Sequence, residues 1–414
     1  MKPTITVVGA GFSGLVTAYY LVKAGERVRV LEKSSRAGGL LQTIHTEHGL
    51  VENAANGLRN SARLEEMCGD IGVPLLVTKR EAGKRFIYRG RPRQWPLTIG
   101  ETLSLAGRLA THVGSFWPRQ FETIADWGRR VLGRGAAEYF LAPALGGIYA
   151  GDPQRLSASL IFRRADLPGD LEVERGARGK NRGTVAPPQG MQQLTDGLFN
   201  FLERSGVEFL FDHTSKAERG DRFIVCTSAR AAGCYLAGIA PEIAEALQRI
   251  EMLPLVTATC FYPPSASRLK GFGCLFPRGQ GFRALGVLFN SSIFEGRGPA
   301  HSETWIFGGA LDREAGQLSR EELAGLIADE RSRLYGRTDE LLAIHSTYWP
   351  EALPHYSIDL ERLLMNFPPW PGKVALVGNY LGGIGLSQIA ERAASVAARF
   401  ARPQGTSPIV KEGS

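Results

Sequence analysis

The sequence predicts an α/β fold: a Rossmann-type domain built from discontinuous segments, a mixed α+β domain, and a helical subdomain that faces either solvent or a membrane. Three observations support this prediction. Near the N-terminus, a glycine-rich turn at residues 9–14 follows the apolar run 5–8 and leads into a helix-like stretch. Near the C-terminus, the apolar run 373–380 leads through another glycine-rich turn into a helix over 388–400. Between residues 250 and 350, strand-like runs alternate with turns.

The first glycine-rich turn has the form G-x-G-x-x-G. It reads Gly9-Ala10-Gly11-Phe12-Ser13-Gly14. In such a turn the first glycine permits the tight bend, the second lets the backbone approach a pyrophosphate, and the third lets the helix pack on the strand. The N–H groups at the start of the helix face the anion. A second strand over 27–31 ends in Glu32, whose carboxylate can accept hydrogen bonds from an adenosine ribose. The turn therefore predicts a dinucleotide site.

The residues after Glu32 distinguish a flavin from a nicotinamide. Arg36, Gly38, Gly39 and Thr43 form the pattern R-x-G-G-x-x-x-T. Gly38 and Gly39 expose backbone N–H groups beside the cofactor, and Arg36 can place a cation near the pyrophosphate. This string resembles the one that follows the second strand in FAD enzymes of the amine oxidase and protoporphyrinogen oxidase superfamily. By that resemblance, Lys33 and Leu40 are also expected to contact FAD.

The C-terminal turn resembles the last FAD motif of the same superfamily. Its expected cofactor contacts are Gly378, Asn379, Gly383, Ile384, Gly385 and Leu386. In those enzymes, the backbone amides and the helix N-terminus of this motif meet the ribityl chain, the pyrophosphate and the pyrimidine edge of the isoalloxazine. Two distant motifs thus predict the same cofactor, FAD.

Composition restricts the class of protein. The chain has 414 residues, of which 43% are hydrophobic and 22% charged, enough for two interleaved domains. Neither a long uncharged apolar stretch nor a signal peptide is apparent, so we expect a cytoplasmic protein, soluble or peripheral on the inner face of the membrane. The five cysteines show no C-x-x-C pair and are expected to be free and buried, and the seven scattered histidines suggest no metal site.

The net charge of +8 is concentrated in one segment. Residues 80–134 hold eleven basic residues against four acidic ones, mixed with leucines, phenylalanines and tryptophans at helical spacing. Such a segment can serve an anionic membrane surface or an acidic substrate, and nucleic acid is not expected because no nucleic-acid motif accompanies the charge. The alternative is an ordinary amphipathic helical subdomain with a solvated basic face.

Several middle segments resemble the protoporphyrinogen oxidase branch. Residues 147–157 match G-x-Y-A-G-D-P-x-x-L-S, and residues 271–277 match G-F-G-x-L-x-P. Residues 285–291 match L-G-x-x-F-x-S, and residues 349–356 match W-x-x-A-x-P-x-Y. With both FAD motifs, these segments span nearly the whole chain in the family's order. The chain is therefore identified as similar to the protoporphyrinogen oxidase family.

The resemblance implies an enzyme of heme and porphyrin biosynthesis. It would remove six electrons from protoporphyrinogen IX in three two-electron rounds, with hydride passing to flavin N5 and oxygen as the acceptor. It also implies cofactor contacts at Ala54, Ala55, Asn56, Gly57 and Trp349. The substrate is a flat apolar ring edged by propionates, for which Arg59, Arg85 and Arg91 are the candidate anchors. No catalytic side chain is identified, since the chemistry needs mainly orientation and exclusion of water.

Other functions stay open at this point. Coproporphyrinogen III is an alternative substrate, and a flavin amine oxidase or a carotenoid-type desaturase can share the cofactor domain. An amine oxidase would need aromatic rings facing the flavin, of which Tyr380 can supply one or else serve as a packing residue. A non-enzymatic FAD-bound scaffold and a homodimer are further alternatives.

The expected domain organisation follows from these segments. The FAD-binding domain takes residues 1–78, 189–235 and 366–414, the helical subdomain for substrate or membrane takes 79–188, and the mixed-sheet substrate domain takes 236–365. Within the helical subdomain, residues 167–188 are rich in Gly, Pro and Arg and are expected to form an exposed loop.

Overall fold

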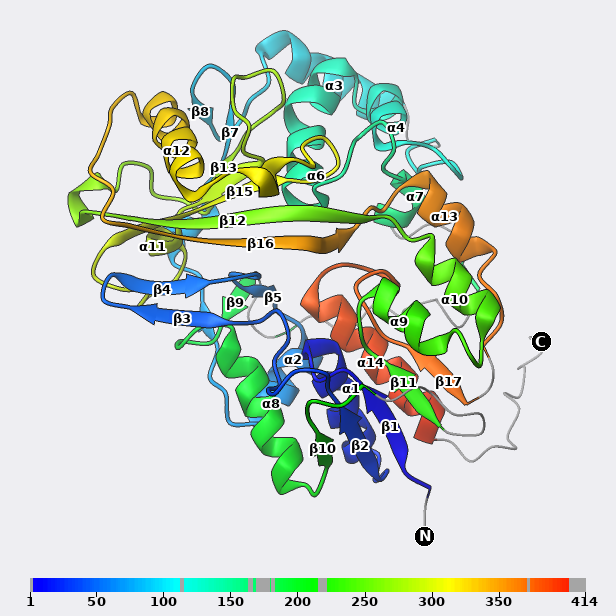
Figure 1. The fold of residues 1–414 in the computed structure, drawn as a ribbon. Helices are drawn as coiled ribbons and strands as arrows, with labels where there is room; N and C mark the ends of the chain where they lie inside the picture. Colours follow the sequence, from blue (N-terminus) through cyan, green and yellow to red (C-terminus); the bar gives the residue numbers. More distant parts are fainter. Residues whose placement is uncertain are drawn as a thin grey trace.

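The computed structural model describes residues 3–111, 115–162, 167–168, 179, 183–214, 222–370 and 373–401. Two large sheets, each covered by helices, lie one above the other in Figure 1. The chain passes between them several times, so each sheet collects strands from distant parts of the sequence.

The lower sheet of Figure 1 has five parallel strands. In spatial order they are β10 (Glu208–Leu210), β2 (Val28–Leu31), β1 (Ile5–Val8), β11 (Phe223–Val225) and β17 (Val374–Leu376). The three central strands are almost entirely apolar, as expected for parallel strands buried on both faces. The predicted Rossmann-type domain of discontinuous segments is confirmed, because its strands come from three separate stretches of the chain.

Helices cover both faces of this sheet. One face packs against a core formed with α1 (Phe12–Lys23), α2 (Ala62–Asp70), α8 (Gln192–Arg204) and α14 (Leu386–Ala401). The other face packs against α9 (Ala229–Leu236), α10 (Pro241–Gln248) and α13 (Ile358–Met365). Ser61 caps α2 by accepting a hydrogen bond from the backbone N–H of Leu64 at 3.3 Å.

The upper sheet of Figure 1 is mixed and has seven strands. In spatial order they are β16 (Ala343–Pro354), β12 (Met252–Tyr262), β15 (His301–Gly308), β14 (Gly286–Leu288), β13 (Gly273–Leu275), β7 (Arg85–Tyr88) and β8 (Pro92–Arg93). Neighbours are antiparallel except β13 and β7. A separate core lies between this sheet and α12 (Arg320–Tyr335), so the predicted mixed-sheet domain is present.

The helical part of the chain lies at the top of Figure 1. It consists of α3 (Ile99–Thr111), α4 (Ile124–Val131), α5 (Arg134–Ala136), a π-helical turn (Ala137–Leu141), α6 (Ala142–Tyr149) and α7 (Ala158–Ile161). Residues 79–188 also supply β7 and β8, which extend the mixed sheet. Among the described residues, no helix is long and apolar enough to cross a membrane.

Short elements connect the two large sheets. They are the hairpin β3 (Thr43–Thr46) and β4 (Gly49–Glu52), the three-stranded sheet β5 (Leu58–Arg59), β9 (Thr184–Ala186) and β6 (Leu76–Val77), helix α11 (Asn290–Ile293), and 3₁₀ turns at Arg80–Gly83, Pro264–Ala266 and Ala315–Gln317. The predicted loop 167–188 lies largely outside the described residues. Its described end is not a loop, because residues 184–186 pair with β5 and β6 on either side.

The expectation of buried thiols needs one correction. Cys68, Cys226, Cys260 and Cys274 are buried and free, whereas Cys234 is exposed. Cys234 lies on the side of α9 that faces away from the core, where the Gln248 amide contacts its sulfur at 3.6 Å. Among the described residues, no group of three or more His, Cys, Asp or Glu side chains is placed to hold a metal ion.

Candidate functional site

The turn between β1 and α1 is built on close backbone contacts. Gly9 has a φ of +100°, and any β-carbon at Gly14 would overlap the Gly9 carbonyl oxygen. The Glu32 carboxylate accepts hydrogen bonds from the Ala10 N–H at 2.7 Å and the Ser34 N–H at 2.9 Å. Glu32 thus sits directly beside the turn, as the sequence predicts for a ribose-binding carboxylate.

Gly11 differs from its neighbours because the protein itself does not require a glycine there. Its φ is −72°, and a β-carbon would meet only the Gly39 Cα, at 3.8 Å. Gly11 also precedes α1 without any side-chain cap, so no capping side chain pairs with the first N–H groups of the helix. A bare backbone in front of a helix N-terminus is what a pyrophosphate needs.

The second glycine pair lies against the first turn. The Gly38 N–H donates to the Ala10 carbonyl at 2.8 Å, and a β-carbon on Gly39 would come within 2.9 Å of the Gly11 Cα. The Arg36 guanidinium donates to the carbonyls of Ala37 and Gly39 at 3.0 and 3.2 Å. Its charge is therefore held at this turn. Lys33 and Leu40, on either side of the pair, are exposed.

The last motif forms a third turn at the end of β17. Gly378 packs on the ring of Tyr380, and Gly383 has a φ of +140°. The Gly385 N–H donates to the Gln388 side chain at 3.0 Å. Asn379 joins the turn to the upper sheet, because its side-chain amide donates to the Ala352 carbonyl on β16 at 3.4 Å. Its own carbonyl accepts a hydrogen bond from the hydroxyl of Tyr356, just after β16, at 2.8 Å. Gly385, Ile384 and Leu386 are half-buried at the start of α14.

A fourth segment, residues 53–57, lies between the two sheets. The Asn53 carbonyl accepts hydrogen bonds from the Trp349 indole N–H at 2.8 Å and from the Thr257 hydroxyl at 3.1 Å. Trp349 therefore holds this segment through its indole nitrogen, and its ring is half-buried. Gly57 is crowded by Thr184, Val185 and Phe294, and Ala54, Ala55 and Asn56 are half-buried.

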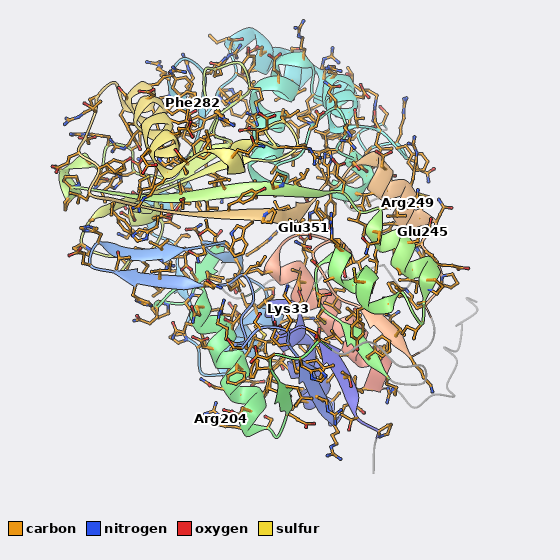
Figure 2. The ribbon with its side chains drawn as sticks, in the orientation of Figure 1. Lys33, Arg204, Glu245, Arg249, Phe282 and Glu351 are labelled. Carbon is orange, nitrogen blue, oxygen red and sulfur yellow. The ribbon has the colours of Figure 1, made fainter. Side chains whose placement is uncertain are left out.

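The predicted cofactor residues gather at one edge of the parallel sheet. The three glycine turns follow β1, β2 and β17, and the carboxyl ends of parallel strands meet at a common edge. Figure 2 shows Lys33 at the end of this sheet that lies nearer β16 and Glu351. The glycine turns of Gly11 and Gly39 touch one another. The arrangement fits an extended dinucleotide that runs from Glu32 past Gly11 toward the last motif.

The predicted substrate anchors are not gathered in one place. Arg59 is exposed on β5, where its carbonyl accepts a hydrogen bond from the Ser387 hydroxyl beside the last motif. Arg85 and Arg91 are exposed at opposite ends of the β7–β8 hairpin. The Arg85 guanidinium lies over the Phe272 ring, 4.7 Å from its centre. Of these three predicted anchors, Arg85 is the one for which the structure gives a contact between its cation and an aromatic face.

The structure decides between the two interpretations of Tyr380. The side chain is fully buried, with 0% exposed, and packs in the core between the parallel sheet and helices α9, α10 and α13. Burial raises the pKa of its hydroxyl well above the ordinary value. Tyr380 is thus a packing residue in this structure, and it does not present a ring to an open site.

One buried cluster was not predicted from the sequence. Glu52 accepts hydrogen bonds from the Met191 N–H at 2.9 Å and the Thr43 hydroxyl at 2.8 Å, and pairs with Arg297 at 3.2 Å. Burial raises the pKa of Glu52 and lowers that of Arg297, although each partner opposes the other's shift. The sequence gives one signal of this cluster, which is a charged residue at the end of the apolar strand β4. It does not indicate the partner, because Arg297 lies 245 residues away.

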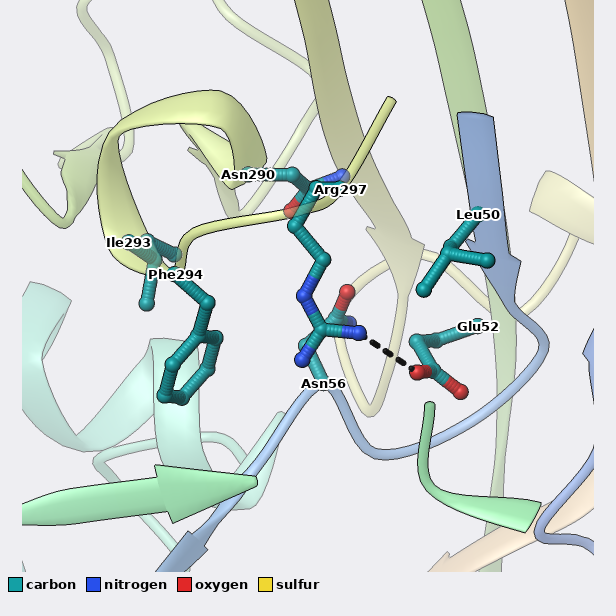
Figure 3. Close-up of a pocket in the computed structure, with 7 residues that line it drawn as sticks. All are labelled: Leu50, Glu52, Asn56, Asn290, Ile293, Phe294 and Arg297. Atoms are coloured by element: carbon teal, nitrogen blue, oxygen red, sulfur yellow. Dashed lines mark hydrogen bonds and ion pairs between the residues drawn. The ribbon is translucent and has the colours of Figure 1, made fainter. Parts of the chain in front are cut away.

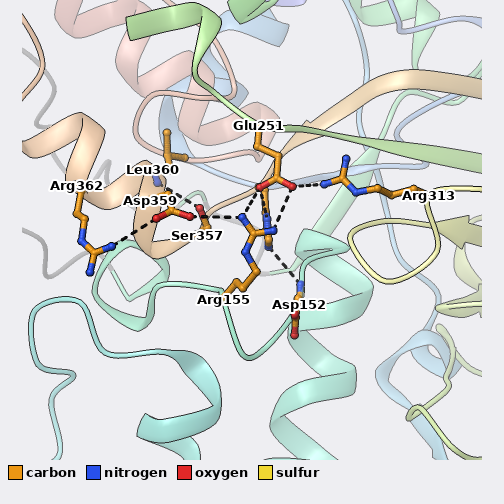
Figure 4. A network of polar contacts seen from close by, with 9 residues as sticks. Asp152, Arg155, Glu251, Arg313, Ser357, Asp359, Leu360 and Arg362 are labelled. Carbon is orange, nitrogen blue, oxygen red and sulfur yellow. Dashed lines mark hydrogen bonds and ion pairs between the residues drawn. The ribbon is translucent and has the colours of Figure 1, made fainter.

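A second cluster surrounds Glu251 where the helical part meets the mixed sheet (Figure 4), and His355 belongs to it through a contact with Glu251. The His355 Nε2 accepts from the Asp152 N–H at 3.3 Å, so Nδ1 carries the proton and donates to Glu251 at 3.0 Å. Glu251 also binds Arg155 at 2.8 Å and Arg313. Burial lowers the pKa of His355, although Glu251 opposes the shift, so the ring is neutral. This cluster joins the loop at 150–157 to the ends of β12 and β16.

Known families and proteins resemble this chain over most of its length. The model of the family of flavin-containing amine oxidoreductases matches residues 12–366. The chloroplastic protoporphyrinogen oxidase of Nicotiana tabacum is 26% identical over 461 aligned positions, which cover 94% of this chain and 84% of that protein. The coproporphyrinogen III oxidase of Bacillus subtilis (strain 168) is 20% identical, with 93% of this chain and 95% of that protein covered.

Solved structures show the same fold. A protein from Exiguobacterium sp. 255-15, provisionally named a protoporphyrinogen oxidase, has a TM-score of 0.75 at 19% identity and covers 97% of this chain and 99% of its own. Cyclohexylamine oxidase from Brevibacterium oxydans IH-35A has a TM-score of 0.69 at 16% identity, with 97% and 100% covered. At these identities the likeness concerns the fold, which oxidases of different substrates share.

Proposed function

Because this chain belongs to the family of flavin-containing amine oxidoreductases, we propose that it oxidises a porphyrinogen, with protoporphyrinogen IX as the expected substrate and oxygen as the acceptor. The chain is an FAD-dependent oxidoreductase. One observation supports a porphyrinogen as the substrate: the similarity to protoporphyrinogen oxidases extends over 94% of the chain and so includes both sheets and the helical part.

The described residues fit FAD. The bare backbone at Gly11, the uncapped start of α1 and the carboxylate of Glu32 would hold the pyrophosphate and the adenosine ribose. The turn at Gly38 and Gly39, and the start of α14, would hold the rest of the cofactor. When bound, FAD supplies the two-electron acceptor that the reaction needs.

The remaining residues would orient the substrate. A porphyrinogen presents a flat apolar ring and carboxylates at its rim, and the stacked pair of Arg85 and Phe272 offers a cation beside an aromatic face. Arg59, next to the last motif, and Arg91, at the tip of the β7–β8 hairpin, are further anchors in this proposal. The chain then contributes orientation and exclusion of water.

An aerobic assay tests the proposed reaction. Purified enzyme given protoporphyrinogen IX should form porphyrin faster than the enzyme-free mixture, with one peroxide for each electron pair removed. A primary amine serves as the matched negative substrate, because exposed arginines disfavour a cationic ligand. Peroxide from the amine and none from the porphyrinogen would refute the proposal in favour of an amine oxidase.

Coproporphyrinogen III is the second candidate substrate. Relatives named coproporphyrinogen III oxidase also cover more than nine-tenths of this chain. Coproporphyrinogen carries more carboxylates than protoporphyrinogen. If Arg59, Arg85 and Arg91 all bind carboxylates of the substrate, the site would therefore favour coproporphyrinogen. Comparing kcat/KM for the two porphyrinogens decides between them.

We further propose that the helical part contacts the anionic inner face of the membrane. Helix α3 has no buried residue, and Ile99 and Leu103 are 82% and 68% exposed. Trp95 and Trp117 are also exposed, and segment 80–134, to which they belong, holds eleven basic residues against four acidic ones. Apolar side chains amid cations suit the headgroup region of anionic lipid.

A further inference from the structure

The ion pair between Glu52 and Arg297 borders a small cavity (Figure 3). Both side chains are more than nine-tenths buried, and their charges are paired at 3.2 Å. The cavity lies between β4, α11 and the segment that follows β4. Its lining residues are Leu50, Glu52, Asn56, Asn290, Ile293, Phe294 and Arg297.

Two buried polar atoms at this cavity have no hydrogen-bond partner among the residues that the structure describes. They are Nη2 of Arg297, a donor, and Oδ1 of Asn290, an acceptor. Both residues are more than nine-tenths buried, and the Asn290 amide nitrogen is already used by the Thr304 hydroxyl at 2.7 Å. A buried polar atom without a partner loses the hydrogen bonds that it makes to water in the unfolded chain, so a ligand at this place is expected.

The chemistry of the lining identifies the ligand. An anion would face the carboxylate of Glu52, and a cation would face the guanidinium of Arg297, so a neutral molecule fits best. It must accept one hydrogen bond and donate another. The cavity leaves about 10 Å³ in which the centre of a water molecule fits, which is room for roughly one water.

We propose that this cavity binds one water molecule between Arg297 and Asn290, and that Arg297 acts through this site as a positioning residue for residues 54–57. The role of that segment at the flavin rests on the proposed function. Asn56 lines the cavity, and Gly57 packs on the ring of Phe294, above which the Arg297 guanidinium lies at 4.9 Å. Trp349 holds the opposite end of the segment through Asn53. The segment is thus fixed from two sides.

A crystal structure of the FAD-bound protein that resolves ordered water tests the site itself. The expected result is a water within about 3.2 Å of both Arg297 Nη2 and Asn290 Oδ1. In an Asn290→Leu variant the water should be lost, because the acceptor is gone and the leucine side chain fills the cavity. An empty cavity in the unmodified protein would overturn the proposal.

Paired variants test the positioning role. Arg297→Lys keeps the charge and loses the second N–H, and Arg331→Lys is the matched control, since Arg331 is equally buried and pairs with Glu303 at 3.1 Å in the mixed-sheet core. Both variants should lower Tm. Only Arg297→Lys should change the ratio of the affinities for oxidised and reduced flavin, by about tenfold. This corresponds to a shift of about 30 mV in the reduction potential of the flavin, a two-electron couple.

Two results would contradict the positioning role: an unchanged flavin potential in Arg297→Lys, or an equal shift in Arg331→Lys. Failure of the proposed function is distinguishable from either. An unmodified protein without flavin absorbance, or one whose flavin porphyrinogens do not reduce, would refute the proposed function, whereas the water in the cavity can be observed in either case.

Discussion

Gly11 shows how a single residue can indicate a ligand. Gly9 and Gly14 are explained by the fold, since Gly9 has a positive φ and Gly14 abuts the Gly9 carbonyl. Gly11 has neither reason. Its missing side chain is explained by the approach of a cofactor to the backbone.

A substitution separates these roles. Gly11→Ala should fold with a Tm close to that of the unmodified protein, and should bind FAD at least about tenfold more weakly, a loss of about 1.4 kcal/mol. Titration of FAD-free protein with FAD measures this. Gly69→Ala, at a helical glycine with no atom within 4 Å of the added carbon, is the control and should leave affinity unchanged. Unchanged affinity in Gly11→Ala would place the pyrophosphate elsewhere.

Arg85 is the anchor with the clearest geometry. Charge reversal, Arg85→Glu, should raise KM for the porphyrinogen about tenfold, because a charged hydrogen bond is worth about 1.5–3 kcal/mol, and should leave the FAD content unchanged. Arg93→Glu, also exposed but on β8, is the matched control. Steady-state kinetics check the difference. If both variants gave the same KM, Arg85 would be an ordinary surface arginine.

The sequence predicts some residues of the site better than others. The glycines were predictable because a local pattern specifies a turn. Tyr380 was not, since the sequence permits either a ring that faces the flavin or a buried ring, and only the packing shows it in the core. The pair of Glu52 and Arg297 was beyond sequence reasoning, because contact between residues 245 positions apart depends on the whole fold.

Helix α3 presents apolar side chains to solvent, because none of its residues is buried. Substituting Ile99 and Leu103 by Glu should each weaken binding to anionic vesicles by about tenfold or more, because burying such a side chain is worth about 1.5–3 kcal/mol. Leu311→Glu, at a leucine that is 51% exposed, is the control. Vesicle co-sedimentation measures the effect. If all variants bound the vesicles equally, α3 would be an amphipathic helix with a solvated face. If the unmodified protein self-associated and did not bind vesicles, α3 would instead belong to a dimer interface.

The junction of β12, β16 and the loop at 150–157 should respond to pH. Burial lowers the pKa of His355, so the unfolded chain binds more protons than the folded protein below the ordinary histidine value of about 6.5. Stability therefore falls as the pH drops from about 7 toward the folded pKa. Glu251, whose lowered pKa results from His355 and Arg155 acting against burial, adds a loss only at lower pH.

Thermal unfolding at pH 7.5 and 5.5 checks this expectation. The unmodified protein should lose more Tm on acidification than His355→Gln, in which the titrating ring is gone. His45→Gln, at an exposed position, should behave like the unmodified protein. A pH dependence that persists in His355→Gln would assign the effect to other groups.

For the whole molecule, the fold class followed from strong local signals. Apolar strands next to glycine turns predict a parallel sheet, and β1 and β17, which precede the two glycine-rich turns, both lie in it. The pairing of β7 with β13 was not predictable, because it joins strands far apart in the chain whose own sequences are short. The site also depends on contacts between distant parts of the chain, since residues 53–57 are held by β12 and β16 of the upper sheet.

Anaerobic mixing of the FAD-bound protein with protoporphyrinogen IX, followed by absorbance in the flavin bands, measures whether electrons pass from a porphyrinogen to the flavin of this chain. We expect the porphyrinogen to bleach the flavin and simple amines to leave it oxidised. If neither protoporphyrinogen IX nor coproporphyrinogen III reduces the flavin, the chain is not a porphyrinogen oxidase.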